Sequence, residues 1–469
     1  MRLRHWQSEC SDLVIQHYEK INKHFLCLAT PGAGKTVMAA EVAMRLYEQG
    51  KIDFILCFSP SVQISQNIKK TLTQRFNANF DGLIGSIGGS YTYQSTLSID
   101  AKFWQLLNKN RVLVIFDEIH HCAGSSIENA NAWGEEILEH VEQQATYTLA
   151  LSGTPWRSDN LPIVLAKYFS EDNILKCDYM YGLGEAIRDK VCRKPKIVLV
   201  DNEKISAVDK SNETKEFNSF KELLSEGVIP YQSIITNKEV MTYILKKGCH
   251  KLAYLRKENP RAAGLVVASN IQHAKDIVHL LQNEFNQSAI VVTYQQDKSQ
   301  QIIEDFRHSD HQWIVSVSMI SEGTDIPRLQ VCCHLSRVKT ELYFRQVLGR
   351  VLRINDAQNQ EAWLYTFAEP KLIEFANRIE QEIPEETVLI KEYYPEDTKD
   401  FPSTNLKNNL RVNQTIELGG NNEKNIGLQE IKLLNEYTEK EVGTNIKSIN
   451  FDIIGKYREQ VISTFSSPF

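Results

Sequence analysis

Residues 29–36, Ala-Thr-Pro-Gly-Ala-Gly-Lys-Thr, combine glycines, a lysine and a hydroxyl group, which together suit the binding of phosphate and magnesium. An apolar run typical of a buried strand precedes them, and residues 35–50 have helical periodicity and end at a glycine. A loop between a strand and a helix points backbone N–H groups at an anion, and the helix dipole adds to the attraction. In such a loop Lys35 reaches the β- and γ-phosphates and the Thr36 hydroxyl binds Mg²⁺. The alternative is a turn that only caps the helix, because the full phosphate-loop pattern has glycine where this chain has Ala29.

An acidic pair, Asp117 and Glu118, ends the apolar run 112–116. In a parallel sheet the carboxyl end of one strand adjoins the loops that follow the other strands, including the loop at 29–36. Hydrolysis of a nucleotide needs one carboxylate that binds Mg²⁺ and a second that orients or deprotonates the attacking water. Asp117 and Glu118 fit these two roles. Taken alone, an acidic pair in this position is equally typical of a helix cap or a solvated turn.

Two further groups of polar residues suit a site that responds to a nucleotide. Ser152 and Thr154 follow another strand-like run and would hydrogen-bond to the acidic loop, although Gly-Thr-Pro is also ordinary turn chemistry. Gln346, Arg350 and Arg353 recur at helical spacing, so we expect them on one helix face. Phosphoryl transfer between two domains needs a cation from the second domain, whereas a solvated helix face is the alternative.

The order of the segments predicts an α/β fold. Short apolar runs alternate with amphipathic helical segments along most of the chain. The runs lie at residues 25–29, 53–59, 112–118, 147–153 and 196–200, and again at 264–269, 289–293, 313–318, 331–336 and 362–367. Such alternation indicates βαβ units and mainly parallel sheets flanked by helices, with ligands at the carboxyl ends of the strands.

We expect two such domains in tandem, followed by a C-terminal extension. The first spans residues 1–200 and the second spans 246–400. Between them, residues 201–245 are polar and predict a linker or small insertion. Residues 401–469 form the extension, which is rich in Asn and Gly, predicts one helix at 428–442 and has no evident role.

Composition excludes several other classes of protein. The 469 residues are 42% hydrophobic and 24% charged, which is ordinary for a globular protein. No apolar run is long enough to span a bilayer, and the first ten residues lack the apolar stretch of a signal peptide. None of the nine cysteines forms a Cys-x-x-Cys pair, so we expect neither disulfides nor a zinc ribbon, and a cytoplasmic location. The net charge of −6 does not indicate a nucleic-acid binder, although basic residues gather between 328 and 353.

Seven motifs in order make the chain resemble superfamily-two helicases. They are "LRHWQ", "ATPGAGKT", "TYQS", "DEIHH", "SGTPWRSD", "SEGTDIP" and "QVLGRVLR", spread over about residues 3–370. The set is most similar to the DEAD/DEAH-box group that includes restriction-enzyme translocases and excision-repair helicases. Several independent motifs in the right order are far more specific than one motif alone. The resemblance implies two tandem RecA-like domains.

The resemblance also implies a role for each motif residue. Gln7 would read the edge of adenine, and ATP with Mg²⁺ would be the cofactor. The phosphates and Mg²⁺ would be held by Thr30, Pro31, Gly32, Ala33, Gly34, Lys35, Thr36 and Asp117, with Gly323 and Asp325 from the second domain. The remaining catalytic residues would be Glu118, Gln346, and Arg350 and Arg353 as arginine fingers. Hydrolysis would be coupled to movement through His120, Ser152 and Thr154. A nucleic-acid strand would be contacted by Thr92, Tyr93, Gln94, Ser269 and Asn270.

Two departures from the family pattern bear on the substrate. Val347 and Leu352 stand where an Arg and a Gly are common, a variant similar to the restriction and repair branch that favours DNA over RNA. The acidic motif is Asp-Glu-Ile-His, which leaves polarity and substrate open. The resemblance therefore implies an ATP-dependent DNA helicase or translocase. The alternatives are an ATP-gated motor subunit of a restriction, repair or anti-phage defence complex, whose partner supplies a nuclease or specificity function, and an RNA helicase.

Overall fold

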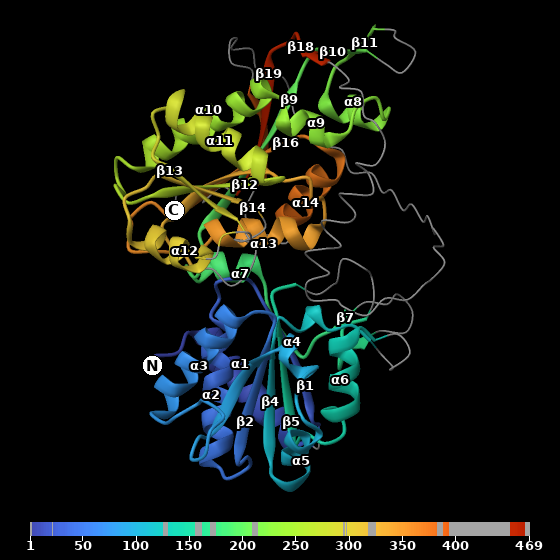
Figure 1. Cartoon of the computed structure of the whole chain (residues 1–469), viewed down its shortest axis with the longest axis vertical. Helices are drawn as coiled ribbons and strands as arrows, with labels where there is room; N and C mark the ends of the chain where they lie inside the picture. Colours follow the sequence, from blue (N-terminus) through green and yellow to red (C-terminus); the bar gives the residue numbers. More distant parts are fainter. Residues whose placement is uncertain are drawn as a thin grey trace.

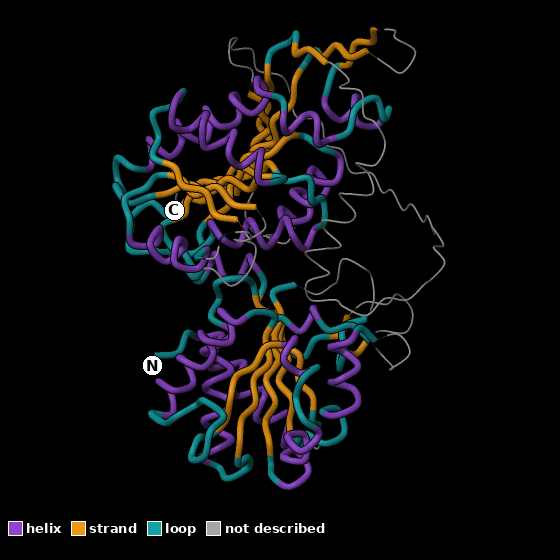
Figure 2. Tube along the Cα trace, in the orientation of Figure 1, coloured by secondary structure: helices purple, strands orange, loops and turns teal. Residues whose placement is uncertain are grey.

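The computed structural model has two α/β domains, each built on its own sheet (Figure 1). It describes residues 2–20, 22–124, 130–154, 162–168, 175–208, 214–293, 296, 298–317, 325–381, 388–393 and 451–464. Figure 2 shows the strands of each domain gathered in one layer with helices on both sides. This arrangement confirms the α/β class with mainly parallel sheets.

The first sheet has six parallel strands in the order β3-β2-β4-β5-β1-β8. Their bounds are His24–Ala29 (β1), Phe54–Ser59 (β2), Gly88–Thr92 (β3), Val112–Asp117 (β4), Tyr147–Ser152 (β5) and Tyr179–Tyr181 (β8). Helical segments of this domain are α1 (His5–Glu19), α2 (Lys35–Glu48), α3 (Val62–Phe76), α4 (Tyr93–Thr96), α5 (Ala101–Lys109), η1 (Ile119–His121), α6 (Ala132–His140) and α7 (Leu183–Arg188). Strands β6 (Lys167–Tyr168) and β7 (Leu175–Lys176) form a separate antiparallel pair.

Successive residues of these strands point into two different cores. Phe25 and Cys27 pack with α1 and α2, whereas Leu26 and Leu28 pack with the other core, which α5 and α6 cover. A strand buried on both faces reads as a continuous apolar run, which is why the sequence shows runs and not alternation.

The second sheet has eight strands in the order β13-β14-β12-β15-β16-β9-β19-β17. Their bounds are Ala263–Ala268 (β12), Ala289–Thr293 (β13), Trp313–Val317 (β14), Leu329–Leu335 (β15), Glu361–Phe367 (β16), Lys194–Asn202 (β9), Tyr457–Thr464 (β19) and Val388–Tyr393 (β17). Adjacent strands from β13 through β14, β12, β15 and β16 to β9 are parallel. Strand β19 runs antiparallel to both of its neighbours, β9 and β17. The principal helices are α10 (Lys238–Leu255), α11 (Ile271–Asn283), α12 (Ser299–His308), α13 (Glu341–Val351) and α14 (Pro370–Gln381).

The domain boundaries differ from those expected. The change of sheet falls between β8 and β9, because β9 pairs with β16 and not with the first sheet, so the boundary expected at residue 200 lies inside a strand of the second domain. An apolar strand run looks the same whichever sheet it joins, which explains the error. Residues 201–245 contain folded elements: β10 (Ile205–Val208), β11 (Thr214–Phe217), α8 (Phe220–Ser225), α9 (Tyr231–Thr236) and the start of α10.

The C-terminal extension contributes to this domain. Strand β18 (Phe451–Ile453) pairs with β10, and β19 pairs with β9. The helix expected at 428–442 lies outside the described residues. Among the described residues, none of the helices combines the length and apolar character that a membrane span requires.

Candidate nucleotide site

The loop between β1 and α2 is shaped by two glycines in the left-handed region. Gly32 has φ +84° and Gly34 has φ +92°, and α2 begins at Lys35. The positive φ at Gly34 favours glycine, and an added Cβ would also lie 2.7 Å from the Gln7 amide nitrogen and displace that side chain. The loop thus brings backbone N–H groups to a helix N-terminus, which is the geometry of an anion site.

Lys35 lies at the centre of the candidate site. Its Nζ is 3.1 Å from the carbonyl oxygen of Ala29 and 3.3 Å from Oε1 of Glu118, and the residue is 8% exposed. The register aligns Asp117 with Leu151 and Leu28 with Ser152, so β1, β4 and β5 end at the same edge of the sheet, where this loop begins. Thr36 and Asp117 both line one small pocket whose other lining residues are apolar, and their binding of a shared Mg²⁺ stays a prediction.

Glu118 adopts a strained backbone conformation. Its φ of +52° is unusual for a residue with a side chain. Its Oε2 accepts a hydrogen bond from the N–H of Gly153 at 3.2 Å, which holds the carboxylate toward β5. The hydroxyl of Tyr93 donates to the carbonyl of Asp117 at 2.9 Å and fixes the preceding residue. Strain supported by surrounding contacts is typical of functional sites.

The structure brings together the three residues predicted to couple hydrolysis to movement. His120 Nδ1 lies 2.8 Å from Oγ of Ser152 and 3.4 Å from Oε2 of Glu118. Ser152 Oγ donates its one proton to the carbonyl of Thr154 at 2.6 Å, so we assign the proton of the histidine to Nδ1. The network links the acidic loop directly to the loop after β5.

The second domain meets the phosphate loop through the end of α13. A Cβ added at Gly349 would lie 2.8 Å from Cβ of Pro31, and one at Gly32 would lie 3.5 Å from Cγ of Arg353. Arg353 forms an ion pair with Asp325, whose place beside the site was also predicted.

Not all of the second-domain residues share one helix face, as the sequence suggested. Gln346 and Arg350 lie on α13, which ends at Val351. Arg353 instead pairs with Cys192 in an isolated β-bridge, because the chain leaves the helix to meet the linker between the domains, which is the segment 189–193 between α7 and β9. Gly323 lies outside the described residues.

Gln7 contacts the phosphate loop. Its amide nitrogen donates to the carbonyl of Gly34 at 2.9 Å, and its Oε1 accepts from the N–H of Arg4 at 2.8 Å. The neighbouring Trp6 stacks on Tyr181 with ring centroids 4.8 Å apart. The contact of Gln7 with adenine stays a prediction.

The residues predicted to contact nucleic acid have local structural roles. The Thr92 hydroxyl caps α4, and Asn270 caps α11 through the N–H of His273 at 2.8 Å. Ser269 Oγ lies 2.8 Å from Nδ1 of the same histidine. The ring of Tyr93 is fully buried, so the prediction that it touches a strand is corrected: it supports Asp117 instead.

Gln94 remains exposed on α4. It therefore keeps a surface for the predicted contact.

Arg4 is a contact that motif reasoning missed. Its Nη1 donates to the carbonyl of Ala33 at 2.7 Å, and it contacts Gly32 as well. The available signal was its place within "LRHWQ", three residues before Gln7.

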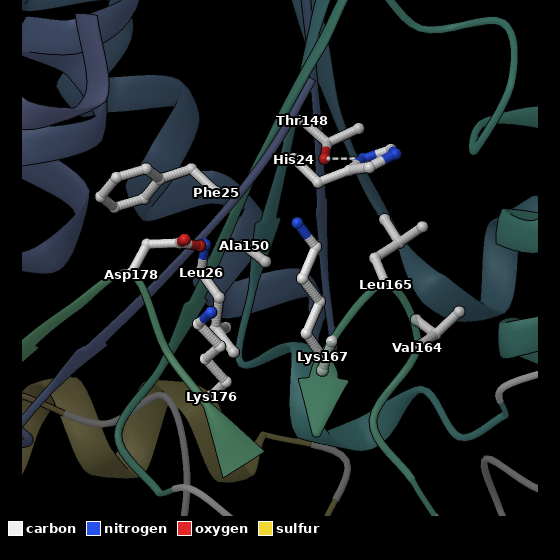
Figure 3. A pocket seen from close by; sticks show the side chains of 11 residues that line it. His24, Phe25, Leu26, Thr148, Ala150, Val164, Leu165, Lys167, Lys176 and Asp178 are labelled. Atoms are coloured by element: carbon white, nitrogen blue, oxygen red, sulfur yellow. Dashed lines mark hydrogen bonds between the residues drawn. The ribbon is translucent and has the colours of Figure 1, made fainter. Parts of the chain in front are cut away.

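A separate recess lies beside strands β6 and β7 (Figure 3). Lys167 and Lys176 point into it, and His24 is hydrogen-bonded to Thr148 at 2.8 Å. Burial and the nearby lysines lower the pKa of His24. No residue of the phosphate loop or the acidic loop lines this recess, so it is distinct from the nucleotide site.

Comparison with known proteins agrees with this geometry. The family model of the type III restriction enzyme res subunit matches residues 1–157, and that of the helicase conserved C-terminal domain matches residues 246–355. An uncharacterized protein of Mycobacterium tuberculosis is 29% identical over 391 residues, which cover 81% of this chain and 63% of that protein. The DNA 3'-5' translocase XPB2 of Sulfurisphaera tokodaii is 23% identical over 76% of this chain and 80% of its own length.

Solved structures share the fold. A fragment described as an HsdR subunit of a type I restriction enzyme from Vibrio vulnificus matches with a TM-score of 0.54 at 16% identity, covering 80% of this chain and 65% of that chain. The type ISP restriction-modification enzyme LlaBIII bound to DNA gives 0.52 at 15% identity, over 82% of this chain and 30% of that chain. The two domains therefore have the fold of tandem RecA-like domains, and the two family-model matches support a superfamily-two helicase of the restriction-like branch. It spans about 63% of the mycobacterial relative.

Proposed function

We propose that this chain is a DNA-dependent ATPase that moves along DNA by hydrolysing ATP between its two RecA-like domains. The observation that carries the proposal is the contact of α13 with the phosphate loop, where Gly349 meets Pro31 and Arg353 meets Gly32. A basic segment of one domain that packs on the phosphate loop of the other suits a shared active site.

The residues present fit ATP and Mg²⁺. The left-handed glycines and the N-terminus of α2 form a cradle for phosphate, and Lys35 supplies a cation within it. Thr36 and Asp117 would hold Mg²⁺, which when bound neutralises charge on the β- and γ-phosphates. Gln7, already at the loop, would select the base.

The protein groups divide the work of hydrolysis. Lys35 is paired with Glu118 at 3.3 Å, and it would exchange this partner for phosphate when nucleotide binds. Glu118 would then orient and deprotonate the attacking water, held by the N–H of Gly153. Arg350 and Arg353 would meet the charge that develops at the γ-phosphate, with Gln346 beside them.

The structural change that accompanies hydrolysis would reach the rest of the first domain through His120. Its contacts with both Glu118 and Ser152 mean that a shift of the carboxylate changes the loop after β5. Opening and closing of the two domains around the nucleotide would then ratchet the strand.

DNA is the proposed substrate in preference to RNA. The related XPB2 is named a DNA translocase, and LlaBIII was solved bound to DNA. Contacts would be made mainly with phosphates, so binding would be tolerant of sequence and sensitive to salt.

A second candidate is a motor subunit that moves on DNA without separating strands. It is favoured by the match of residues 1–157 to a family described as the res subunit of a type III restriction enzyme, that is, as one subunit of an enzyme. A protein partner would then supply a nuclease or specificity function.

The test is the ATPase rate with no nucleic acid, single-stranded DNA, duplex DNA and RNA. We expect a low basal rate that DNA raises more than RNA does. Equal rates in all four samples would overturn the proposal. Triplex displacement without strand displacement would select the motor-subunit candidate, and activity in both assays would select the helicase.

A further inference from the structure

Arg193 is a fully buried cation in the linker between the two sheets. It lies just before β9 and reaches into the second domain. Its Nη1 donates to the carbonyls of Leu329 at 2.5 Å and Val351 at 3.2 Å, and its Nη2 donates to that of Pro327 at 2.8 Å. Its Nε donates to the side chain of Gln360 at 3.2 Å. One side chain therefore ties together several separate segments of the second domain.

Two of those segments carry residues of the proposed ATP site. Pro327 follows Asp325 by two residues, and Val351 precedes Arg353 by two residues. The backbone reinforces the tie, because the N–H of Arg193 donates to the carbonyl of Leu352 at 2.7 Å. The guanidinium thus binds the backbone of both segments, at Pro327 and at Val351, close to the ion pair between Arg353 and Asp325.

The same stretch of linker also touches the phosphate loop. Cys192 forms the isolated bridge with Arg353, and its Sγ lies 3.6 Å from the carbonyl oxygen of Pro31. The linker is therefore in contact with both halves of the proposed site, and Arg193 lies on the side of the second domain.

Arg193 has no carboxylate partner among the described residues; all of its contacts are with neutral oxygens. Burial alone lowers its pKa to about 9. A buried charge without a counter-charge is costly, and apolar residues of similar size often replace such groups without loss of stability. A planar fork that reaches several carbonyls at once is something that only arginine supplies.

We propose that Arg193 is a positioning residue that fixes the Arg353 and Asp325 segments at the distance from the phosphate loop that hydrolysis requires. The inference rests on the proposed ATPase function. It predicts that losing the fork leaves the first-domain cradle intact, so that nucleotide binds but turns over slowly.

The experiment compares Arg193→Lys and Arg193→Met with a matched control, Arg328→Met. Arg328 is 6% exposed, and its pKa is lowered to about 10 mainly by burial. It too donates only to carbonyls, those of Phe306, His311 and Arg261. Arg328 stands between Pro327 and Leu329, but its own acceptors lie on α12, after α12 and before β12. The control therefore removes a buried cation from the Asp325 side while it leaves the fork of Arg193 and the Arg353 segment in place.

The readouts are the dissociation constant of a fluorescent ATP analogue, the DNA-stimulated kcat and the thermal midpoint. Misplacing a catalytic group by about 1 Å costs about 10²-fold in rate. For Arg193→Lys we expect a kcat lower by about 10- to 100-fold with affinity changed less than about threefold. Arg328→Met should lower the thermal midpoint while kcat falls less than about threefold. A wild-type kcat in Arg193→Lys, or an equal loss in the control, would overturn the proposal.

Hydrogen exchange separates this inference from the proposed function. In nucleotide-free protein, Arg193→Lys should speed exchange in the peptide covering 345–355, and Arg328→Met should not. If the wild type hydrolyses no ATP with any nucleic acid, the proposed function fails, while faster exchange still supports the tie. Unchanged hydrogen exchange in Arg193→Lys would overturn the positioning role of Arg193, whatever the ATPase result.

Discussion

Gly349→Ala tests the contact on which the shared active site depends. Gly349 lies on α13 in the second domain, and the added methyl carbon would sit 2.8 Å from Cβ and 3.2 Å from Cγ of Pro31. Carbon atoms pack best at about 3.5–4.0 Å, so the two elements must separate by about 0.7–1.2 Å. Because they belong to different domains, a small opening of the interface relieves the clash.

We expect Gly349→Ala to lower the rate of ATP turnover without lowering the stability of the protein. Misplacement of catalytic groups by about 1 Å costs about 10²-fold, so we expect kcat to fall by about 10- to 100-fold. The phosphate cradle is in the first domain, so the KM for ATP should change less than about threefold. Within the helix itself, alanine is more favourable than glycine by about 0.5–1 kcal/mol, so the variant should not unfold more easily.

The assay is DNA-stimulated ATP turnover beside thermal unfolding, with Gly182→Ala as the matched control. A Cβ at Gly182 meets only Oε2 of Glu185, at 3.7 Å, and the φ of −76° suits alanine. The control should retain kcat within about twofold. Normal turnover by Gly349→Ala would refute the reasoning, since hydrolysis would then not need α13 at the distance seen here.

Four further predictions follow from the site and the core. Glu118→Gln should bind ATP and DNA but turn over at least about 10²-fold more slowly, measured as phosphate release, because a base is removed and the metal ligand kept. Arg350→Ala should bind ATP and lose about 10³-fold or more in rate, whereas Lys35→Ala should also lose affinity in nucleotide titrations. Gln7→Ala should lower the affinity for ATP more than the affinity for GTP in nucleotide titrations. Equal losses of affinity would mean that Gln7 only stabilises the phosphate loop. The pKa of the buried His334 is lowered from 6.5 to about 4, so the unfolded chain takes up a proton first as pH falls below 6.5. His334 alone should therefore lower stability by about 1.4 kcal/mol per pH unit down to pH 4. Denaturant titrations of His334→Leu at pH 7.5 and 5.5 should lack that component and keep the one from buried His273, whose pKa is also lowered to about 4.

Ten strands of the two sheets were predicted within two residues at each end, because both faces of these strands are covered and they read as apolar runs. The expected run 147–153 is β5 at Tyr147–Ser152, and the expected helix after the phosphate loop is α2 at Lys35–Glu48. Strand β3 at Gly88–Thr92 was missed, since it is rich in Gly and Ser and has no apolar run.

Motif reasoning found the chemical groups of the site better than their supports. Parallel strands end at one edge, so the proximity of Lys35 to Glu118 followed from the order of the motifs. The role of Tyr93 was misjudged, because nothing in a local motif says that its ring packs on Trp133 in the core. Arg193 was invisible for the same reason, since its acceptors lie more than 130 residues away along the chain.

Strand β19 stabilises the strand that follows the linker. Strand β9 begins right after Arg193 and is held on one side by β16 and on the other by β19, which is among the last described elements of the chain. Tyr457 of β19 stacks on Tyr243 of α10 with centroids 3.9 Å apart, and Glu459 accepts a hydrogen bond from the hydroxyl of Tyr243 at 2.7 Å. A strand paired on both edges moves with its whole sheet. In the proposed cycle, β9 and Arg193 would therefore move together with the second sheet, and the chain would have to deform between β8 and Cys192, next to the phosphate loop.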